Sequence, residues 1–164
     1  MQPWITTPVA PMKKYFDINT NLAVITILLL PAYSAMSSDA VQSCNDGAQT
    51  QLDINHCGSL DFQSADKELN AVYKAVLEQH KTNIKFLEKL KAAQRAWLKW
   101  RDAEMEAVYP EKDAPSYYGS SFPACRNTQL SNLTQERTKQ LQKWLDGVEE
   151  GDVCSGSYPS SFKK

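Results

Sequence analysis

The amino-acid sequence predicts an all-α fold: an antiparallel helical hairpin with a third helix packed on it, forming a small bundle stabilised by disulfides. Two observations predict this fold. Apolar residues recur at spacings of three and four in three successive segments, which is the period of an amphipathic helix. Four cysteines follow a segment with the pattern of an export signal, and an even number of cysteines in a small exported chain favours disulfides.

Length and composition limit the chain to one globular domain. It has 164 residues, of which 42% are hydrophobic, and its formal net charge is −1. A chain of this size can bury its own core. A near-neutral charge argues against a nucleic-acid binder, which needs a basic face. The glycines form no phosphate-binding motif, so the sequence indicates a folded protein without nucleotide chemistry.

Residues 12–35 have the three parts of a secretory signal. Lys13 and Lys14 precede an apolar run at residues 22–30, and small residues follow it. The run is shorter than the roughly 20 residues that span a bilayer, so no membrane anchor is expected after cleavage. We predict cleavage after Ser34 or Ser37, Met12 as the true start, and residues 1–11 as a mis-assigned start. The protein is therefore expected in the periplasm or outside the cell.

The first helix is expected to begin at Thr50, because Thr50 and Asp53 form the pattern of a capping box. Gly58 and Ser59 could interrupt it. Its apolar stripe consists of Ala65, Leu69, Val72, Tyr73, Val76 and Leu77.

Thr82 or Asn83 can cap the second helix, which contains no Gly or Pro before Pro110. Its apolar face consists of Phe86, Leu90, Ala93, Trp97 and Trp100. Three tryptophans, Trp97, Trp100 and Trp144, could form a ligand-binding box, although aromatics at helical spacing usually form a core.

The third helix is expected from Asn127 or Leu130 to Leu145. Residues 110–123, before it, contain three prolines, two tyrosines and a phenylalanine, which predicts a long loop. Such loops in compact bundles are often functional. Residues 155–164 are rich in Ser, Gly and Pro and predict a flexible tail, which leaves residues 44–154 as the helical domain.

The cysteines Cys44, Cys57, Cys125 and Cys154 are expected to form two disulfides. Three connectivities are possible, and the spacing does not select one. Zinc would need paired Cys or His ligands at close spacing, which are missing from the sequence. We predict no metal site and no cofactor.

No arrangement of residues predicts catalysis. No serine or cysteine stands at a persuasive spacing from the only two histidines, His56 and His80. Nearby carboxylates such as Glu104 and Glu106 point in different directions on a helix. We therefore predict that the protein is not an enzyme; a hydrolase acting on the cell envelope is the weakest alternative.

Arg137 lies on the apolar stripe of the third helix, where an unpaired charge would be costly. Asp66 is a candidate partner for it or for Arg101. We interpret these side chains as a structural ion-pair network, with an anion-binding site as the alternative. The predicted network comprises Asp66, Asn70, Tyr73, Trp97, Arg101 and Arg137.

Three stretches, residues 44–57, 65–73 and 93–104, resemble the LprI-type lysozyme inhibitor family. The most specific of these motifs is AQRAW followed by RDAE, at residues 93–97 and 101–104. The family's glycine–serine loop, its later cysteine and its T-x-x-R-x-x-x-L motif correspond to residues 118–121, Cys125 and residues 134–141. The chain departs from the pattern at Met105, where a cysteine is common, and by having Cys154.

The resemblance implies an exported helical protein that inhibits lysozyme. Animal lysozymes are basic, so an inhibitor should present acidic surface and a loop that enters the sugar-binding cleft. Lys112 or Arg126 could meet the catalytic carboxylates of the lysozyme. The expected partner-binding residues are Glu111, Lys112, Asp113, Tyr117, Tyr118, Gly119 and Ser120. The alternative is a structural or envelope-stress protein that binds another partner.

Overall fold

The computed structural model describes the backbone of residues 30–161 and the side chains of residues 39–161. These residues form five helices: α1 Leu30–Gly47, α2 Gln51–Gln79, α3 Ile84–Val108, α4 Ala114–Tyr118 and α5 Phe122–Asp146. The predicted all-α helical bundle is confirmed. Residues 1–11 and most of the predicted signal lie outside the described residues, and residues 30–35 of that signal belong to α1.

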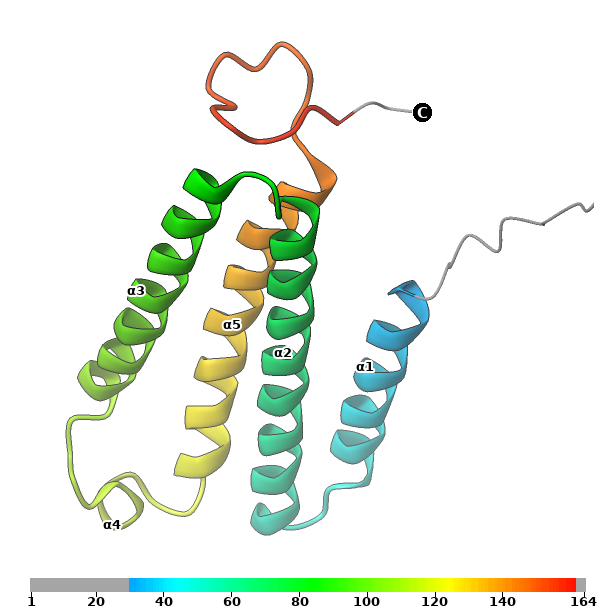
Figure 1. Ribbon diagram of the computed structural model, residues 1–164. Coiled ribbons are helices and arrows are strands. Elements are labelled where there is room, and N and C mark those ends of the chain that lie inside the picture. The colour runs from blue at the N-terminus through cyan, green and yellow to red at the C-terminus, as the bar shows by residue number, and fades with distance from the viewer. Residues whose placement is uncertain (1–29, 162–164) are drawn as a thin grey trace, which may run out of the picture.

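The long helices stand side by side (Figure 1). α2 and α5 run in the same direction. α3, which follows α2 in the sequence, runs antiparallel to both. α1 lies along the other side of α2, and α4 lies at the end of the bundle where α3 finishes and α5 begins. Within the described residues, no helix combines the length and apolar character needed to cross a membrane.

The caps at the start of α2 and α3 agree with the sequence. Thr50 Oγ1 accepts from the Asp53 amide at 3.2 Å, and the Thr50 amide donates to the Asp53 carboxylate at 2.9 Å. The Thr50 hydroxyl also donates to the Asp53 carboxylate, at 2.8 Å. This bond, and to a lesser extent the bonds from the backbone amides of Thr50 and Gln49, lower the pKa of the Asp53 carboxyl. Asn83 Oδ1 accepts from the Phe86 amide at the start of α3.

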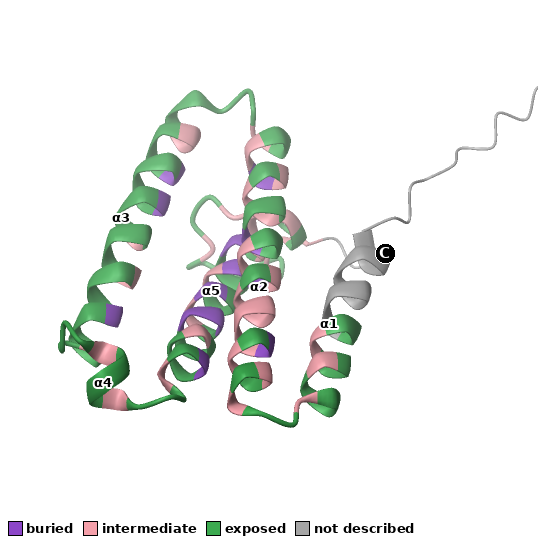
Figure 2. Ribbon diagram, turned by 90° about the horizontal axis from the view of Figure 1, so that it is seen from below, coloured by how far each residue is buried: buried purple, intermediate pink, exposed green. Residues whose placement is uncertain are grey.

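The core lies where α2, α3 and α5 meet. Leu69 and Val76 of α2, Leu90 of α3 and Leu141 of α5 are buried there. The buried residues of α3 lie on the side that faces α2 and α5 (Figure 2). Half-buried side chains that surround this core are Val72, Tyr73, Leu77, Phe86, Trp97, Trp144 and Leu145.

Small residues line the contact between α2 and α5. A Cβ added at Gly58 would lie 3.2 Å from the Cα of Ala124, so the two backbones approach closely. Ser131, Thr134 and Thr138 of α5 are also buried. The predicted interruption at Gly58 and Ser59 is wrong, because α2 runs through both residues. Gly58 lets α5 pack close to α2, and α2 continues through it without a break.

The loop predicted at residues 110–123 is shorter than expected. α4 occupies its middle, and α5 begins at Phe122, earlier than the expected Asn127 or Leu130. Pro115 and Pro123 stand in the first turns of α4 and α5, where the missing N–H of proline costs nothing. Two of the three prolines that indicated a loop therefore stand at the start of helices.

The segment after α5 folds back on that helix. The Val148 amide donates to the Pro159 carbonyl, and the Ser161 amide donates to the Val148 carbonyl, each at 2.8 Å. Tyr158 packs on Trp144 with 4.1 Å between ring centroids. The predicted flexible tail begins at residue 155, but its described part is held by these contacts.

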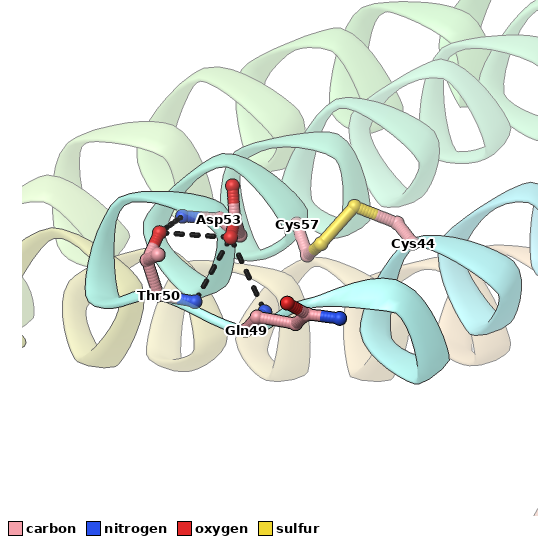
Figure 3. Close-up of a disulfide and its surroundings, with 5 residues drawn as sticks. All are labelled: Cys44, Gln49, Thr50, Asp53 and Cys57. Carbon is pink, nitrogen blue, oxygen red and sulfur yellow. Dashed lines mark hydrogen bonds between the residues drawn. A yellow bond between two sulfur atoms is a disulfide. The ribbon is translucent and has the colours of Figure 1, made fainter.

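One disulfide joins α1 to α2, between Cys44 and Cys57 (Figure 3). The prediction of a second disulfide is wrong, because Cys125 and Cys154 are free and exposed. Cys125 lies in the first turn of α5, whereas Cys154 follows the end of that helix. About 30 Å of helix separates them, at 1.5 Å per residue, and a disulfide needs Cα atoms within about 7 Å.

We predict that Gly58→Val destabilises the protein by about 1–3 kcal/mol, because the larger side chain must separate α2 from α5. Chemical denaturation will measure the free energy of unfolding. Gly47→Val is the control, since a Cβ at Gly47 meets nothing within 4 Å. Equal stability of the two variants would contradict a close contact at Gly58.

We predict that Cys44→Ala lowers the free energy of unfolding by about 2–3 kcal/mol, because the disulfide restricts the unfolded chain. Hydrogen exchange should accelerate in residues 39–47 and stay slow along α2 and α5. Cys125→Ala and Cys154→Ala are controls and should change stability by less than about 0.5 kcal/mol. A large effect of either control would place a second disulfide in the protein.

Candidate functional site

The predicted partner-binding residues come together at one end of the bundle. Glu111, Lys112 and Asp113 are exposed in the turn between α3 and α4. Tyr117 and Tyr118 belong to α4, and Gly119 ends this helix with φ 81°, a conformation that favours glycine. Ser120 follows it, before α5. We call residues 109–123 the loop end; Figure 1 shows it around α4.

Four rings form an aromatic cluster at the loop end: Tyr109, Tyr117, Tyr118 and Phe122. Tyr118 lies at its centre, with ring centroids 5.3 Å from Tyr109, 4.9 Å from Tyr117 and 5.6 Å from Phe122. Tyr118 is half-buried, whereas Tyr117 is 69% exposed. Burial raises the pKa of the Tyr109 hydroxyl, and nearby Cys125 and Tyr118 raise it further. The cluster thus holds one exposed tyrosine on a packed support.

Asn55 of α2 fastens the loop end to the bundle. Its Nδ2 donates to the Ser120 carbonyl at 2.9 Å, and its Oδ1 accepts from the Ala124 amide at 3.2 Å. Ser121, the N-cap residue of α5, makes no side-chain capping bond. The side chain of Asn55, on the neighbouring helix α2, therefore accepts a hydrogen bond from the Ala124 N–H, which has no partner within α5 itself.

Two carboxylates lie beside the aromatic cluster, and three more lie in the adjoining parts of the chain. Asp102 and Glu106 of α3 line a small cavity of about 180 Å³ together with Tyr109, Phe122 and Arg126. Glu104 lies on the same helix, about 200° around it from Glu106, and Glu111 and Asp113 lie in the following turn; all three are exposed. In the described residues, these five carboxylates form one ion pair, between Asp102 and Arg101. Five carboxylates thus lie at this end of the bundle, together with the cationic side chains of Arg101, Lys112 and Arg126.

The structure joins Arg101, Trp97 and Arg137 of the predicted network, because both guanidinium groups lie near the Trp97 ring, but it leaves Asp66 and Asn70 out of these contacts. Asp66 accepts from Asn70 one turn along α2, so the predicted pairing of Asp66 with an arginine is wrong. Arg101 binds its neighbour Asp102 and lies over Trp97, 5.4 Å from the ring centroid. Tyr73 packs against the core, as Trp97 does.

Arg137 takes a neutral partner. Its Nε donates to Gln94 Oε1 of α3 at 3.0 Å, and its guanidinium lies 5.9 Å from the Trp97 centroid. Nη1 donates to Gln140 on α5. Burial lowers the pKa of this guanidinium. The arginine therefore links α5 to α3 without a neutralising carboxylate in the described part of the chain.

Two residues that organise these sites, Asn55 and Gln94, were not among the sequence-predicted candidates. Each is an uncharged amide inside a helix, where hydrogen bonds across helices leave no periodic signal. Both nevertheless stand inside motifs of the family resemblance, before Cys57 and in AQRAW. Among the described residues, no group of three or more His, Cys, Asp or Glu side chains could hold a metal ion.

Comparison with known proteins identifies the family. A family model described as lysozyme inhibitor LprI matches residues 43–141. The chain belongs to the LprI lysozyme inhibitor family. The matched region begins just before Cys44 and extends into the last part of α5, so it includes the disulfide, Asn55 and the whole loop end. The folded-back segment and Cys154 lie beyond it.

One relative is the uncharacterized protein R02472 of Rhizobium meliloti (strain 1021). It is 30% identical over 136 residues, which cover 76% of this chain and 94% of the relative. The similarity therefore extends over nearly the whole relative. No solved structure matches the chain.

We predict that Asn55→Ala loosens the loop end without unfolding the bundle. The amide of Ala124 should exchange about 5-fold faster, because loss of a capping bond costs about 1 kcal/mol. Hydrogen exchange resolved by residue is the measurement. Gln63→Ala is the matched control, since the Gln63 amide bonds only Ser59 within α2. Unchanged exchange at residues 119–124 in Asn55→Ala would show that α5 is capped in another way.

Proposed function

We propose that this LprI family protein is an exported, non-catalytic inhibitor that binds a basic lysozyme through its loop end. The observation that carries the proposal is Tyr117, which is exposed on a packed aromatic cluster at an end of the bundle that also holds Asp102 and Glu106. Tyrosines in such positions are common anchors of protein interfaces, because they bury a large area at a small cost in conformational entropy.

Charge supports the same assignment. Glu104, Glu106, Glu111 and Asp113 would attract a cationic partner and accelerate its approach. Lys112 and Arg126 lie in the same region and could meet the catalytic carboxylates of a lysozyme cleft. The fastening of the loop end by Asn55 reduces the ordering cost of binding, because the backbone is already held.

We predict that Tyr117→Ala weakens inhibition at least about 10-fold, as expected for a central interface tyrosine. The measurement is the rate at which C-, G- or I-type lysozymes lyse a peptidoglycan suspension in the presence of the purified, oxidised protein. Ile84→Ala is the control: Ile84 is 62% exposed and lies at the opposite end of α3.

The charges supply a second readout of the same experiment. Glu106→Gln with Glu111→Gln should slow association with lysozyme and reduce its dependence on salt. Glu149→Gln with Glu150→Gln removes equal charge at the other end of the bundle and should change neither. If the unaltered protein inhibits no lysozyme class, the alternative of an envelope protein with another partner takes precedence. Inhibition that survives Tyr117→Ala would exclude the loop end as the contact.

A further inference from the structure

A groove separates the first half of α3 from the last part of α5, far from the loop end. Its volume is about 490 Å³. Phe86, Leu90 and Trp144 supply apolar walls, and three cationic side chains, those of Lys85, Lys89 and Arg137, also line it. Apolar walls with a few converging charged groups are typical of small-molecule sites.

The apolar wall of the groove is fixed in place. Phe86 and Trp144 are in contact, with 4.4 Å between ring centroids, and Tyr158 packs on Trp144 from the folded-back segment. Gln79, the last residue of α2, and His80, which follows it, both hydrogen-bond the Trp144 carbonyl, at 3.2 Å each. An entering apolar group would therefore meet an aromatic surface that needs no rearrangement.

The three cations lack anionic partners in the described part of the chain. Lys85, Lys89 and Arg137 form no ion pair, although Glu88 lies between the two lysines in the sequence. By contrast, Lys81 and Lys139 each pair with the glutamate three residues before them in the sequence. The positive charge of the groove is thus left uncompensated by the part of the chain that the structure describes.

Arg137 is the most constrained of the three. Its Nε and Nη1 donate to amide oxygens of Gln94 and Gln140, which orient the guanidinium without neutralising it. A guanidinium has five N–H donors in a planar fork that matches a carboxylate. The two bonds to glutamine leave donors available for an anion in the groove.

The position of Lys85 adds an independent argument. It stands in the first turn of α3, which contains no acidic residue. A positive charge there is unfavourable, because the helix dipole places partial positive charge at this end. Stability of the helix therefore does not explain Lys85, whereas an anionic ligand in the groove would.

We propose that this groove binds an organic carboxylate with an aromatic or bulky apolar group. The carboxylate would meet Arg137 and the two lysines, and the apolar group would lie against Phe86 and Trp144. Two sources share this chemistry: a free organic acid, and the C-terminus of a peptide that ends in an apolar residue. The proposal is independent of lysozyme binding at the loop end.

The test titrates the full chain with 4-phenylbutyrate and follows the Trp144 indole and Arg137 Nε signals by ¹H–¹⁵N NMR. We expect a dissociation constant of about 1 mM, reasonable for a ligand of this size. Butyrate and 4-phenylbutanol, each lacking one half of the ligand, should bind at least about 10-fold more weakly. Equal binding of the alcohol, or tighter binding of inorganic phosphate, would overturn the proposal.

Variants locate the site. Lys85→Gln with Lys89→Gln should weaken 4-phenylbutyrate binding about 10-fold, whereas Lys91→Gln with Lys99→Gln should not, because neither Lys91 nor Lys99 lines the groove. Both pairs replace exposed lysines of α3, so folding should persist in each. Equal effects of the two pairs, or signal changes confined to the loop end, would also overturn the proposal.

A further comparison identifies the source of the ligand. A short peptide ending in a free phenylalanine carboxylate is titrated beside the same peptide with an amidated end. Tighter binding of the free peptide than of 4-phenylbutyrate would support a peptide C-terminus, and weaker binding would support a free organic acid. Binding of the amidated peptide as tight as that of the free peptide would contradict a carboxylate site.

Discussion

The close contact between α2 and α5 is the constraint on which the rest of the structure depends. Gly58 brings the α2 backbone against Ala124, and the buried Ser131, Thr134 and Thr138 continue a line of small residues along α5. Each small side chain buries little area, so the attraction between α2 and α5 depends on how closely the two backbones approach. This close contact has an energetic cost, because the buried hydroxyl of Thr134 has no hydrogen-bond partner among the described residues. Larger residues would fill this line better but would separate the helices.

Both surfaces of interest follow from that parallel pair. Because α2 and α5 run in the same direction, the start of one helix lies beside the start of the other. Asn55 can therefore cap α5 and hold Ser120, while Gln79 and His80 hold the Trp144 carbonyl at the far end. The same arrangement makes α3 span the length of the bundle, which places the loop end and the groove at opposite ends of one helix.

Local sequence rules predicted the helices and their caps, since Thr50, Asp53 and Asn83 act within a few residues of themselves. They failed where a partner is distant in sequence. Gly58 was interpreted as a possible helix breaker, because its contact with Ala124 of α5 cannot be seen in the sequence. Prolines at the start of α4 and α5 read as loop residues for a related reason: proline favours both loops and first turns. The even number of cysteines suggested two bridges, but the length of α5 keeps Cys125 from Cys154.

The charges of α3 connect the two proposed surfaces. Lys85 lies in its first turn and Glu106 in its last, and each has the sign that the helix dipole disfavours. Helix stability alone would favour the opposite arrangement. Reversing both charges should therefore leave the isolated α3 helix at least as stable. Any advantage of a positive charge at the start and a negative charge at the end must then come from what the two ends of the helix contact. A basic groove for an organic anion at one end, and carboxylates beside the loop end for a basic protein at the other, would account for both together.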